Sequence, residues 1–433
     1  IIIKKGFPHM KKKILPAAII VGLIILILGI IGISSLIRKY TPTKETEDLN
    51  KYFNISSEDE SALIVDNTVS DSKAKLIDGK IYVDYNFVHD SLNSRFYWDA
   101  NENVLLYTTA ADIVSAAADS STYTVTKQAN DFGYPIVKAT SSSALIALDY
   151  VKQFSNITYK SYDKPSRTVI TTSWGKIETA STAKSTQLRV KGGIKSPILK
   201  QVKKGESLTI LEKGTKWDKA ASKDGIVGYI KASTLSDIKT TELKNNDYTE
   251  EAFTHIKKDK DICLAWHQIT NKSSNSKVAN VISSTKGVNV MSPTWFYLND
   301  NNGGLADLAS KDYVNYCHSQ GIEVWGLFSN LENKNVDAAS VLTHTSTRTT
   351  LINQIMSAAF NYELDGVNID FENITKEAYG DSYIEFIREL AIKCHNNGIS
   401  LSVDVTVPAS YNKFFNRADM ANFADYVIIM GYD

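Results

Sequence analysis

The sequence has few cysteines and no excess of either charge, and both shortages exclude whole classes of protein. Its 433 residues include three cysteines, Cys263, Cys317 and Cys394. Such an odd and sparse set forms no disulfide framework, and none of the three lies in a C-x-x-C metal pair. We therefore expect three buried thiols, no metal site and no cofactor. Basic and acidic residues balance at 48 each, so net charge gives no reason to expect a nucleic-acid partner.

What the chain does have is a long apolar run near its N-terminus. A lysine-rich segment at 11–13 precedes residues 14–37, which are almost all apolar. The run is long enough to span a bilayer as a helix and too long for a signal-peptide core. Lysines before the run outnumber Arg38 and Lys39 after it, which predicts a cytoplasmic segment at 1–13 and an extracellular remainder. A cleaved signal is the alternative, although no small-x-small site follows the run clearly.

Two segments with different patterns follow the apolar run. Residues 41–61 are polar and acidic, which is typical of a flexible linker or stalk. Residues 62–174 contain short alternating strands and a repeated unit in which a helix-like stretch leads to a strand hairpin. The two copies are 85–92 with 96–109, and 144–154 with 159–172. This small α+β segment resembles the copper amine oxidase N-terminal-like domain of Gram-positive cell-surface proteins, but it has no His cluster that could bind copper.

Residues 184–238 predict a compact all-β unit, because short strand patterns alternate with Gly and Lys-Gly turns. The order Gly-Glu-x-Leu-x-Ile, Trp-x-Lys, Gly-x-x-Gly-Tyr-Ile resembles a bacterial SH3-like domain, a module that typically docks on peptidoglycan. Trp217, Tyr229 and Lys231 could form its ligand groove. The alternative, which we favour, is that Trp217 closes the small core.

From residue 259 onward, buried strands alternate with helices, for example at 311–319 and 383–395. The six apolar strand runs are 262–266, 288–291, 322–328, 364–371, 399–407 and 426–430. Near-continuous apolar strands separated by helices indicate a parallel sheet, and this spacing predicts an α/β fold, the (β/α)8 TIM barrel. Such barrels need about 250 residues. We therefore expect the barrel at 259–433 to be truncated after its sixth strand.

A Cys-His-x-x-Gly-Ile sequence occurs twice in this region, beginning at Cys317 and at Cys394. Both copies stand at the same turn of a repeated βα unit, with Gly321 and Gly398 as the expected helix terminators. This repetition explains the paired Cys-His without a metal ion.

One strand carries polar residues where a half-buried strand usually carries apolar ones. The apolar set is Val367, Ile369 and Phe371, and the alternating polar set is Asn368, Asp370 and Glu372. Two carboxyls two residues apart on one face repel each other when both are ionised, which raises one pKa and favours acid–base chemistry near neutral pH. The alternative is an edge strand with a solvated acidic face.

Three motifs resemble one enzyme family. D-G-V-N-I-D-F-E at 365–372 is similar to the D-x-x-D-x-D-x-E signature of glycoside hydrolase family 18, the chitinase-like enzymes. S-P-T-W-F at 292–296 and I-I-M-G-Y-D at 428–433 resemble the ends of the second and sixth barrel strands in that family. The resemblance is closest to the bacterial cell-wall-lytic and spore-cortex-lytic members.

The resemblance implies a role for each matching residue. Glu372 would be the general acid that protonates the glycosidic oxygen. Asp370 would orient the substrate's N-acetyl group, whose carbonyl oxygen acts as the nucleophile, so that configuration is retained through an oxazolinium intermediate. Tyr432 would hydrogen-bond the same group, and Met430 and Asp433 would line the subsite.

Five further residues would support or line the site. Asp365 would support the strand end from behind. Asn368 stands where the family usually has an Asp that shares a proton or a hydrogen bond with residue 370, and this departure bears on the pH optimum. Trp266, Trp295 and Phe296 could stack on sugar rings, with Trp295 our first choice and Trp325 a weaker one.

The sequence thus predicts a membrane-anchored extracellular glycosidase that cleaves β-1,4 bonds next to N-acetylglucosamine. Peptidoglycan on the Gram-positive cell-wall side is the expected substrate, because of the anchor and the SH3-like module. Three alternatives remain: a hydrolase of chitin or chitooligosaccharides, a catalytically silent chitin-binding or peptidoglycan-binding lectin, and a structural wall protein. Family lectins typically lose the acid at the position of Glu372, so its presence favours an enzyme.

Overall fold

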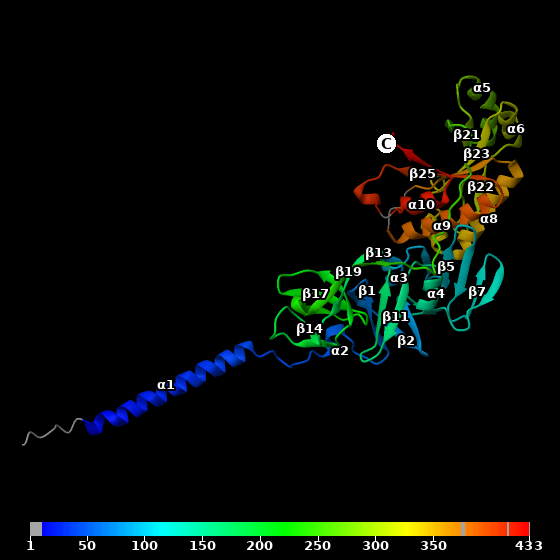
Figure 1. The fold of residues 1–433 in the computed structure, drawn as a ribbon. Coiled ribbons are helices and arrows are strands. Elements are labelled where there is room, and N and C mark those ends of the chain that lie inside the picture. Colours follow the sequence, from blue (N-terminus) through cyan, green and yellow to red (C-terminus); the bar gives the residue numbers. More distant parts are fainter. Residues whose placement is uncertain (1–10, 373, 375–376, 414, 433) are drawn as a thin grey trace, which may run out of the picture. The chain divides into compact units, whose positions relative to one another are not determined.

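The computed structural model describes residues 11–372, 374, 377–413 and 415–432. The chain divides into two compact units, each built from two separate stretches (Figure 1). Unit 1 takes in Ile1–Asp71 and Thr158–Asn245, and unit 2 takes in Ser72–Ile157 and Asn246–Asp433. The predicted domains at 62–174, 184–238 and 259–433 were assigned from sequence patterns, and those assignments stay predictions.

The predicted apolar helix is present as α1 (Lys11–Tyr40). Within it, Ile19–Tyr40 has the length and composition of a membrane span. Its mean hydropathy is 2.9, and none of this apolar stretch is buried against the rest of the protein. An apolar helix of this kind serves either as an anchor or as a signal sequence. The orientation of the chain across a membrane stays a prediction.

The stalk predicted at 41–61 contains a folded part. Residues Leu49–Phe53 form the short helix α2, and Phe53 is fully buried in the core of unit 1. The Tyr52 hydroxyl donates a hydrogen bond to the Val227 carbonyl oxygen at 2.8 Å. The prediction of a flexible stalk is therefore wrong for this stretch, because a few apolar side chains within an acidic segment are enough to dock it.

Unit 1 is otherwise built from strands. β1 (Glu60–Val65) pairs in parallel with β12 (Arg167–Thr171), which pairs antiparallel with β11 (Thr158–Tyr162). A second, seven-stranded sheet has the order β15-β14-β18-β17-β16-β13-β19. Its strands are β13 (Gly175–Thr182), β14 (Thr186–Arg189), β15 (Ile198–Val202), β16 (Ser207–Glu212), β17 (Trp217–Ser222), β18 (Val227–Lys231) and β19 (Leu235–Leu243). The predicted all-β character of 184–238 is confirmed, with one short 3-10 helix at 232–234.

Trp217 does not close the core of this unit. Its side chain is half-buried and lies outside the core cluster, whereas Asp218 next to it is buried. In the register of β17 and β18, Trp217 is paired with Lys231 and Lys219 with Tyr229. Because paired residues share a face of the sheet, these four side chains lie together on the face opposite Asp218.

The first stretch of unit 2 contains the first copy of the expected repeat and the helical part of the second copy, whose hairpin belongs to unit 1. The elements of this stretch are β2 (Thr68–Ile77), which begins in unit 1, β3 (Lys80–Asp84), α3 (Tyr85–Ser91), β4 (Phe96–Asp99), β5 (Val104–Thr108), β6 (Ile113–Ala117), β7 (Thr122–Val125), β8 (Gln128–Asp131), β9 (Val137–Ala139), β10 (Ala144–Ala147) and α4 (Leu148–Gln153). Both predicted hairpins are present, as β4–β5 and β11–β12. The predicted helix at 144–154 is wrong in its first turn, because Leu145–Ala147 pair with β3.

The second stretch of unit 2 contains the six predicted parallel strands. They are β20 (Leu264–His267), β21 (Val290–Leu298), β23 (Glu323–Ser329), β24 (Gly366–Asp370), β25 (Ser400–Thr406) and β26 (Tyr426–Met430). The sheet has these strands in sequence order, every neighbouring pair is parallel, and the short β22 (Leu305–Asp307) pairs antiparallel with β21. The prediction of a parallel α/β sheet is confirmed, whereas its truncation stays a prediction.

Helices connect these strands. They are α5 (Val278–Ser283), α6 (Lys311–Ser319), α7 (Ala338–Thr343), α8 (Thr345–Tyr362), α9 (Glu377–His395) and α10 (Arg417–Phe423). Gly321 and Gly398 follow α6 and α9 with φ angles of +70° and +68°. Only glycine adopts this left-handed conformation without a steric cost, so both are the helix terminators that the sequence predicts.

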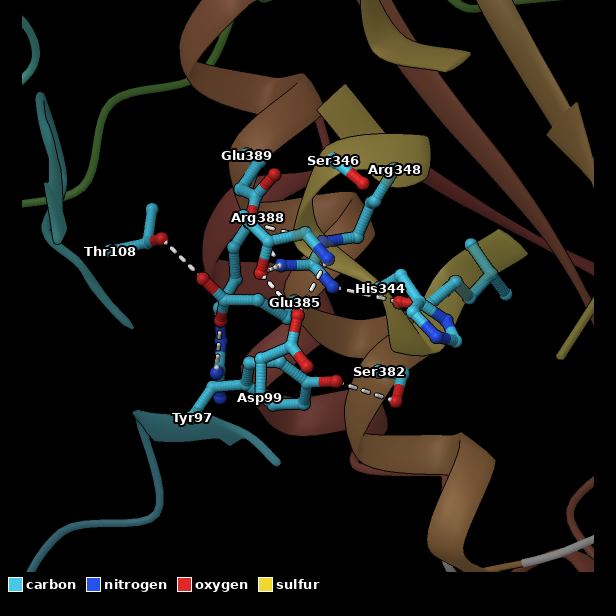
Figure 2. A network of polar contacts seen from close by, with 12 residues as sticks. Tyr97, Asp99, Thr108, His344, Ser346, Arg348, Ser382, Glu385, Arg388 and Glu389 are labelled. Atoms are coloured by element: carbon cyan, nitrogen blue, oxygen red, sulfur yellow. Dashed lines mark hydrogen bonds and ion pairs between the residues drawn. The ribbon is translucent and has the colours of Figure 1, made fainter. Parts of the chain in front are cut away.

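The two stretches of unit 2 are joined by a buried polar network between β4–β5 and helices α8 and α9 (Figure 2). The Tyr97 hydroxyl and the Ser382 hydroxyl lie 2.9 Å apart, and the Thr108 hydroxyl donates to Glu385 at 2.7 Å. Asp99 accepts a hydrogen bond from the Thr345 backbone N–H at 2.6 Å. A compact unit that contains the parallel sheet therefore also contains residues upstream of 259.

The cysteines differ in exposure. Cys317 and Cys394 are buried, as expected, and burial raises the pKa of the Cys317 thiol to about 12. Cys263 is exposed, so the prediction of three buried thiols is wrong there. It lies just before β20, outside the strand in which the sequence pattern placed it.

Candidate functional site

The strand that carries the polar row is central in its sheet. β24 lies between β23 and β25, which excludes the edge-strand alternative. Val367 and Ile369 are fully buried in the core, and Asn368 on the opposite face is fully buried as well. Asp370 ends the strand and is only partly buried. The polar row therefore leads from the sheet interior toward the carboxyl end of the strand, where active sites of parallel α/β folds form.

Glu372 follows β24 and is held by a neighbouring strand end. Asn330, just after β23, accepts a hydrogen bond from the Glu372 backbone N–H at 2.9 Å and donates one to the Glu372 carbonyl oxygen at 2.7 Å. Both peptide groups of Glu372 are thus fixed by one side chain. Glu372 lines a cavity of about 410 Å³ together with Asp404, Tyr411 and Met430, among others.

Two carboxyls near Glu372 have raised pKa values. Burial, with smaller contributions from the charges of Glu372 and Glu332, raises the pKa of Asp370 to about 6. Burial also raises the pKa of Asp404 to about 7, with the charge of Asp370 adding to it. Repulsion between the carboxyls of the polar row, expected from the sequence, is thus present at Asp370, although burial is the larger cause.

Asn368 is the centre of a hydrogen-bond network that joins three strands to β24. Its Oδ1 accepts from Trp266 Nε1 at 3.0 Å and from the Ser292 hydroxyl at 2.9 Å. Its Nδ2 donates to Asp404 Oδ1 at 2.9 Å. An aspartate here would place its negative charge directly against the Asp404 carboxyl, so the amide fits a site that already contains one acid.

The remaining predicted site residues lie at different places. Trp266 and Tyr432 are 38% and 68% exposed, and their rings meet edge to face at 6.3 Å. Met430 is buried at the end of β26 and lines the cavity. Asp365 lies just before β24, at the end of the strand away from the cavity. Its carboxylate accepts hydrogen bonds from His318 Nε2 and from the Val324 N–H, both at 2.8 Å. It therefore anchors the strand without contacting Glu372. Asp433 lies outside the described residues.

The aromatic residues of β21 and β23 belong to the core. Trp295 is fully buried and its Nε1 donates to Asn275 Oδ1 at 2.8 Å. Phe296 is stacked on Phe328 with ring centroids 4.5 Å apart. Trp325, the weaker candidate, is also fully buried. The structure gives no support to Trp295 or Phe296 as sugar-stacking residues, because neither ring reaches the surface.

Several residues around the cavity were missed by the sequence reasoning. Asp404, Asn330 and the exposed Tyr411 are the clearest cases. A signal for Asp404 was present, because Ser400, Ser402, Asp404 and Thr406 alternate with apolar residues along β25 as the polar row does along β24. Tyr411 follows β25 in a loop, where no periodicity indicates the direction of a side chain.

Metal ligands do not gather in the described part of the chain. No group of three or more His, Cys, Asp or Glu residues there could hold a metal ion. The histidines of the repeated Cys-His instead contact carboxylates, His318 with Asp365 at 2.8 Å and His395 with Asp425 at 3.1 Å.

Comparison with known proteins identifies the domain that holds this cavity. Residues 226–433 match the family model described as glycosyl hydrolases family 18. The C-terminal part of the chain is thus similar to glycosyl hydrolase family 18, a family of TIM-barrel-like glycosidases. The matched range contains all three motifs on which the resemblance to this family was based.

Individual relatives are distant. The chain is 23% identical over 145 residues to the uncharacterized glycosylase YvbX of Bacillus subtilis (strain 168), which covers 31% of this chain and 42% of that protein. The spore cortex-lytic enzyme SleL of Bacillus megaterium QM B1551 is 17% identical, with a TM-score of 0.34 and coverage of 39% of this chain and 42% of that one. A chitinase from Chromobacterium violaceum ATCC 12472 is 20% identical, with a TM-score of 0.34 and coverage of 40% and 56%. The chain thus spans less than two thirds of each relative.

Proposed function

We propose that this protein is a glycosidase that cleaves β-1,4 bonds next to N-acetylglucosamine by a retaining, substrate-assisted mechanism. One observation carries the proposal: Glu372, whose backbone is fixed by Asn330, lines a cavity beside the partly buried carboxyl of Asp370, which has a raised pKa. A proton donor next to a carboxylate that can balance positive charge is the pair that this reaction needs.

The chemical roles follow from the two environments. Glu372 protonates the glycosidic oxygen as the bond breaks. Asp370, when ionised, accepts a hydrogen bond from the acetamido N–H and balances the positive charge that develops as the acetamido oxygen attacks the anomeric carbon. Trp266 offers an exposed ring to the sugar, Tyr432 hydrogen-bonds the acetamido group, and Met430 lines the subsite.

Peptidoglycan is the proposed substrate, and two features outside the cavity support it. The apolar helix α1 would hold the enzyme at a membrane with its catalytic domain outside the cell. Trp217, Tyr229, Lys219 and Lys231 share one face of unit 1. Aromatic rings next to lysines suit a polymer of sugars and acidic peptides, as expected for an SH3-like wall-binding module.

The test of this function is Glu372→Gln in the full-length protein. Glutamine keeps the shape of the side chain but cannot donate a proton as an acid, so turnover of N-acetylglucosamine oligomers should fall at least about a hundredfold. Binding of the oligomers should persist, because the cavity keeps its shape. Glu363→Gln is the matched control, since Glu363 is an exposed residue at the end of α8 that pairs with Lys311. Unchanged turnover in Glu372→Gln would refute the assignment.

Product analysis separates the possible substrates. Mass spectrometry of digests of purified peptidoglycan and of chitin would show which polymer is cut, and reducing ends at N-acetylglucosamine in the wall digest are expected. Cleavage of chitin alone would replace the wall by chitin as the substrate. Tight binding of both polymers with no cleavage of either would favour the lectin reading over an enzyme.

A further inference from the structure

The orientation of the Asn368 amide is fixed by its neighbours. The indole N–H of Trp266 can only donate, so the atom of Asn368 that it contacts must be the oxygen. The amide nitrogen therefore faces the other way, toward Asp404. One of its two N–H groups donates to Asp404 Oδ1. Because the Trp266 contact prevents the amide from flipping, Asn368 always presents a donor, and never an acceptor, to Asp404.

Asp404 and Asp370 lie beside each other on neighbouring strands. The parallel register pairs Asn368 with Ser402 and Ile369 with Val403, so Asp370 and Asp404 follow at the same level on the same face. Asp404 is only 3% exposed. Among the described residues, Asp370 Oδ1 and Asp404 Oδ2 are buried without a hydrogen-bond partner. Two such oxygens can both be satisfied if the carboxyls share one proton.

We propose that Asp404 is a positioning residue of the glycosidase site: it retains the shared proton and so leaves the negative charge on Asp370. The deeper carboxyl keeps the proton because ionising it would cost more desolvation free energy. The partly exposed Asp370 then carries the charge that faces the substrate's acetamido group. This inference rests on the proposed function for its meaning, but the protonation of the pair can be measured without any substrate.

The groups that face Asp404 fit a neutral, proton-holding acid. On β24 these are Asn368 and Asp370, with Glu372 just after the strand, and Glu332 after β23 faces Asp370. From α9, the fully buried Tyr383 faces both aspartates, and its hydroxyl has no hydrogen-bond partner among the described residues. On β20, the Trp266 N–H donates to the amide oxygen of Asn368, and both side chains lower the pKa of Asp404 against the larger effect of burial, which raises it. The residue of β26 that pairs with Asp404 is the apolar Ile428. A negative charge on Asp404 would therefore add to the one that Asp370 already carries.

Two substitutions at Asp404 separate proton retention from simple structural support. Asp404→Asn keeps an acceptor for Asn368 and an N–H donor for Asp370, so Asp370 stays ionised in the same range. Asp404→Leu removes the donor, and Asp370 then remains alone in a buried site, which raises its pKa. Since activity should fall as Asp370 becomes protonated, we expect the acid limb of the kcat/KM profile near pH 6 in the natural protein.

The expected result is a shift of this acid limb that depends on the substituent. In Asp404→Leu the limb should move up by about one pH unit, so that activity falls about fivefold at pH 6, about ninefold at pH 5 and hardly at all at pH 8. In Asp404→Asn the limb should not move up, and the ratio of kcat/KM at pH 5 to kcat/KM at pH 8 should stay within about twofold of that of the natural protein. A lower kcat in Asp404→Leu with an unmoved acid limb would assign a structural role only and overturn the proposal.

A direct titration makes the outcome independent of catalysis. Carboxyl infrared bands of the protein labelled with 13C-aspartate, recorded without substrate, should contain a protonated acid that persists above pH 6 and disappears in Asp404→Asn. If the difference between the spectra of the natural protein and Asp404→Asn showed Asp404 ionised at pH 6, the proposal would be overturned. If this titration appears as expected while the natural protein cuts no glycan, the proposed function fails and the proton-holding pair stands.

Discussion

The buried pair of Arg348 and Glu389 offers the most quantitative test of how unit 2 is held together. The Arg348 guanidinium is fully buried and donates to Glu389 Oε1 at 3.1 and 2.9 Å and to the Leu342 carbonyl oxygen at 2.7 Å. It also lies 5.0 Å from the ring centre of Tyr97 on β4. Burial raises the pKa of Glu389 to about 7 even though Arg348 opposes the shift.

Replacing Arg348 by methionine leaves Glu389 as an unpaired buried acid. Breaking a buried pair in this way costs about 3–5 kcal/mol. A domain of this size loses about 2–4 °C in Tm for each kcal/mol, so a fall of about 6–20 °C is expected. The pKa of Glu389 is already above its unfolded value and rises further in the variant. The loss should therefore be smallest near pH 4.5, where Glu389 is protonated in the folded natural protein and in the folded variant alike, and should grow as the pH rises through 7 to 8.

Tryptophan fluorescence during thermal unfolding measures this loss, because unit 2 contains four of the six tryptophans, namely Trp98, Trp266, Trp295 and Trp325. Arg348→Met with Glu389→Leu should recover most of the lost stability, since it leaves no buried charge. Lys311→Met is the control, because Lys311 and Glu363 form an exposed pair worth about 0–1 kcal/mol. A loss below about 1 kcal/mol in Arg348→Met, or an equal loss at both pH values, would refute the reasoning.

Two further predictions concern burial. Phe53→Ala should destabilise unit 1 by about 3–5 kcal/mol, because the Phe53 ring is fully buried. Phe360→Ala is the control and should change stability little, because its ring is exposed. Equal losses of stability in chemical unfolding would show that α2 is not docked. An alkylating thiol reagent should modify Cys263 in the folded protein and leave Cys317 and Cys394 unmodified until unfolding. Modification of either buried thiol under native conditions, read by mass spectrometry of peptides, would contradict that burial.

The parallel sheet was predictable because its signals are local. Each of the six strands is an apolar run, and helix α6 has the bounds that its sequence pattern predicts. Gly321 and Gly398 end helices where left-handed backbone is needed. Elements that depend on distant partners were harder to predict. The first turn of the expected helix at 144–154 is a strand only because β3 pairs with it.

The candidate site was predictable along one strand and not across strands. The alternation in β24 places Asn368 and Asp370 correctly on one face, because period two is a property of a single strand. Direction toward the cavity or the core depends on the neighbouring layer, so Trp295 and Trp266 could not be told apart by alternation. Asp404 belongs to the site through the register of β24 and β25, which no single strand encodes.

Helix α9 links the upstream residues of unit 2 to the cavity. Tyr383 on this helix lines the cavity and faces Asp370 and Asp404, while the adjacent Ser382 and the nearby Glu385 are bonded to β4 and β5. The hairpin at 96–108 is therefore bonded to the helix that supplies Tyr383 to the cavity wall. A change in the length or sequence of this hairpin should therefore shift Tyr383 and alter the shape of the cavity, and residues 259–433 expressed without the hairpin would lack this support.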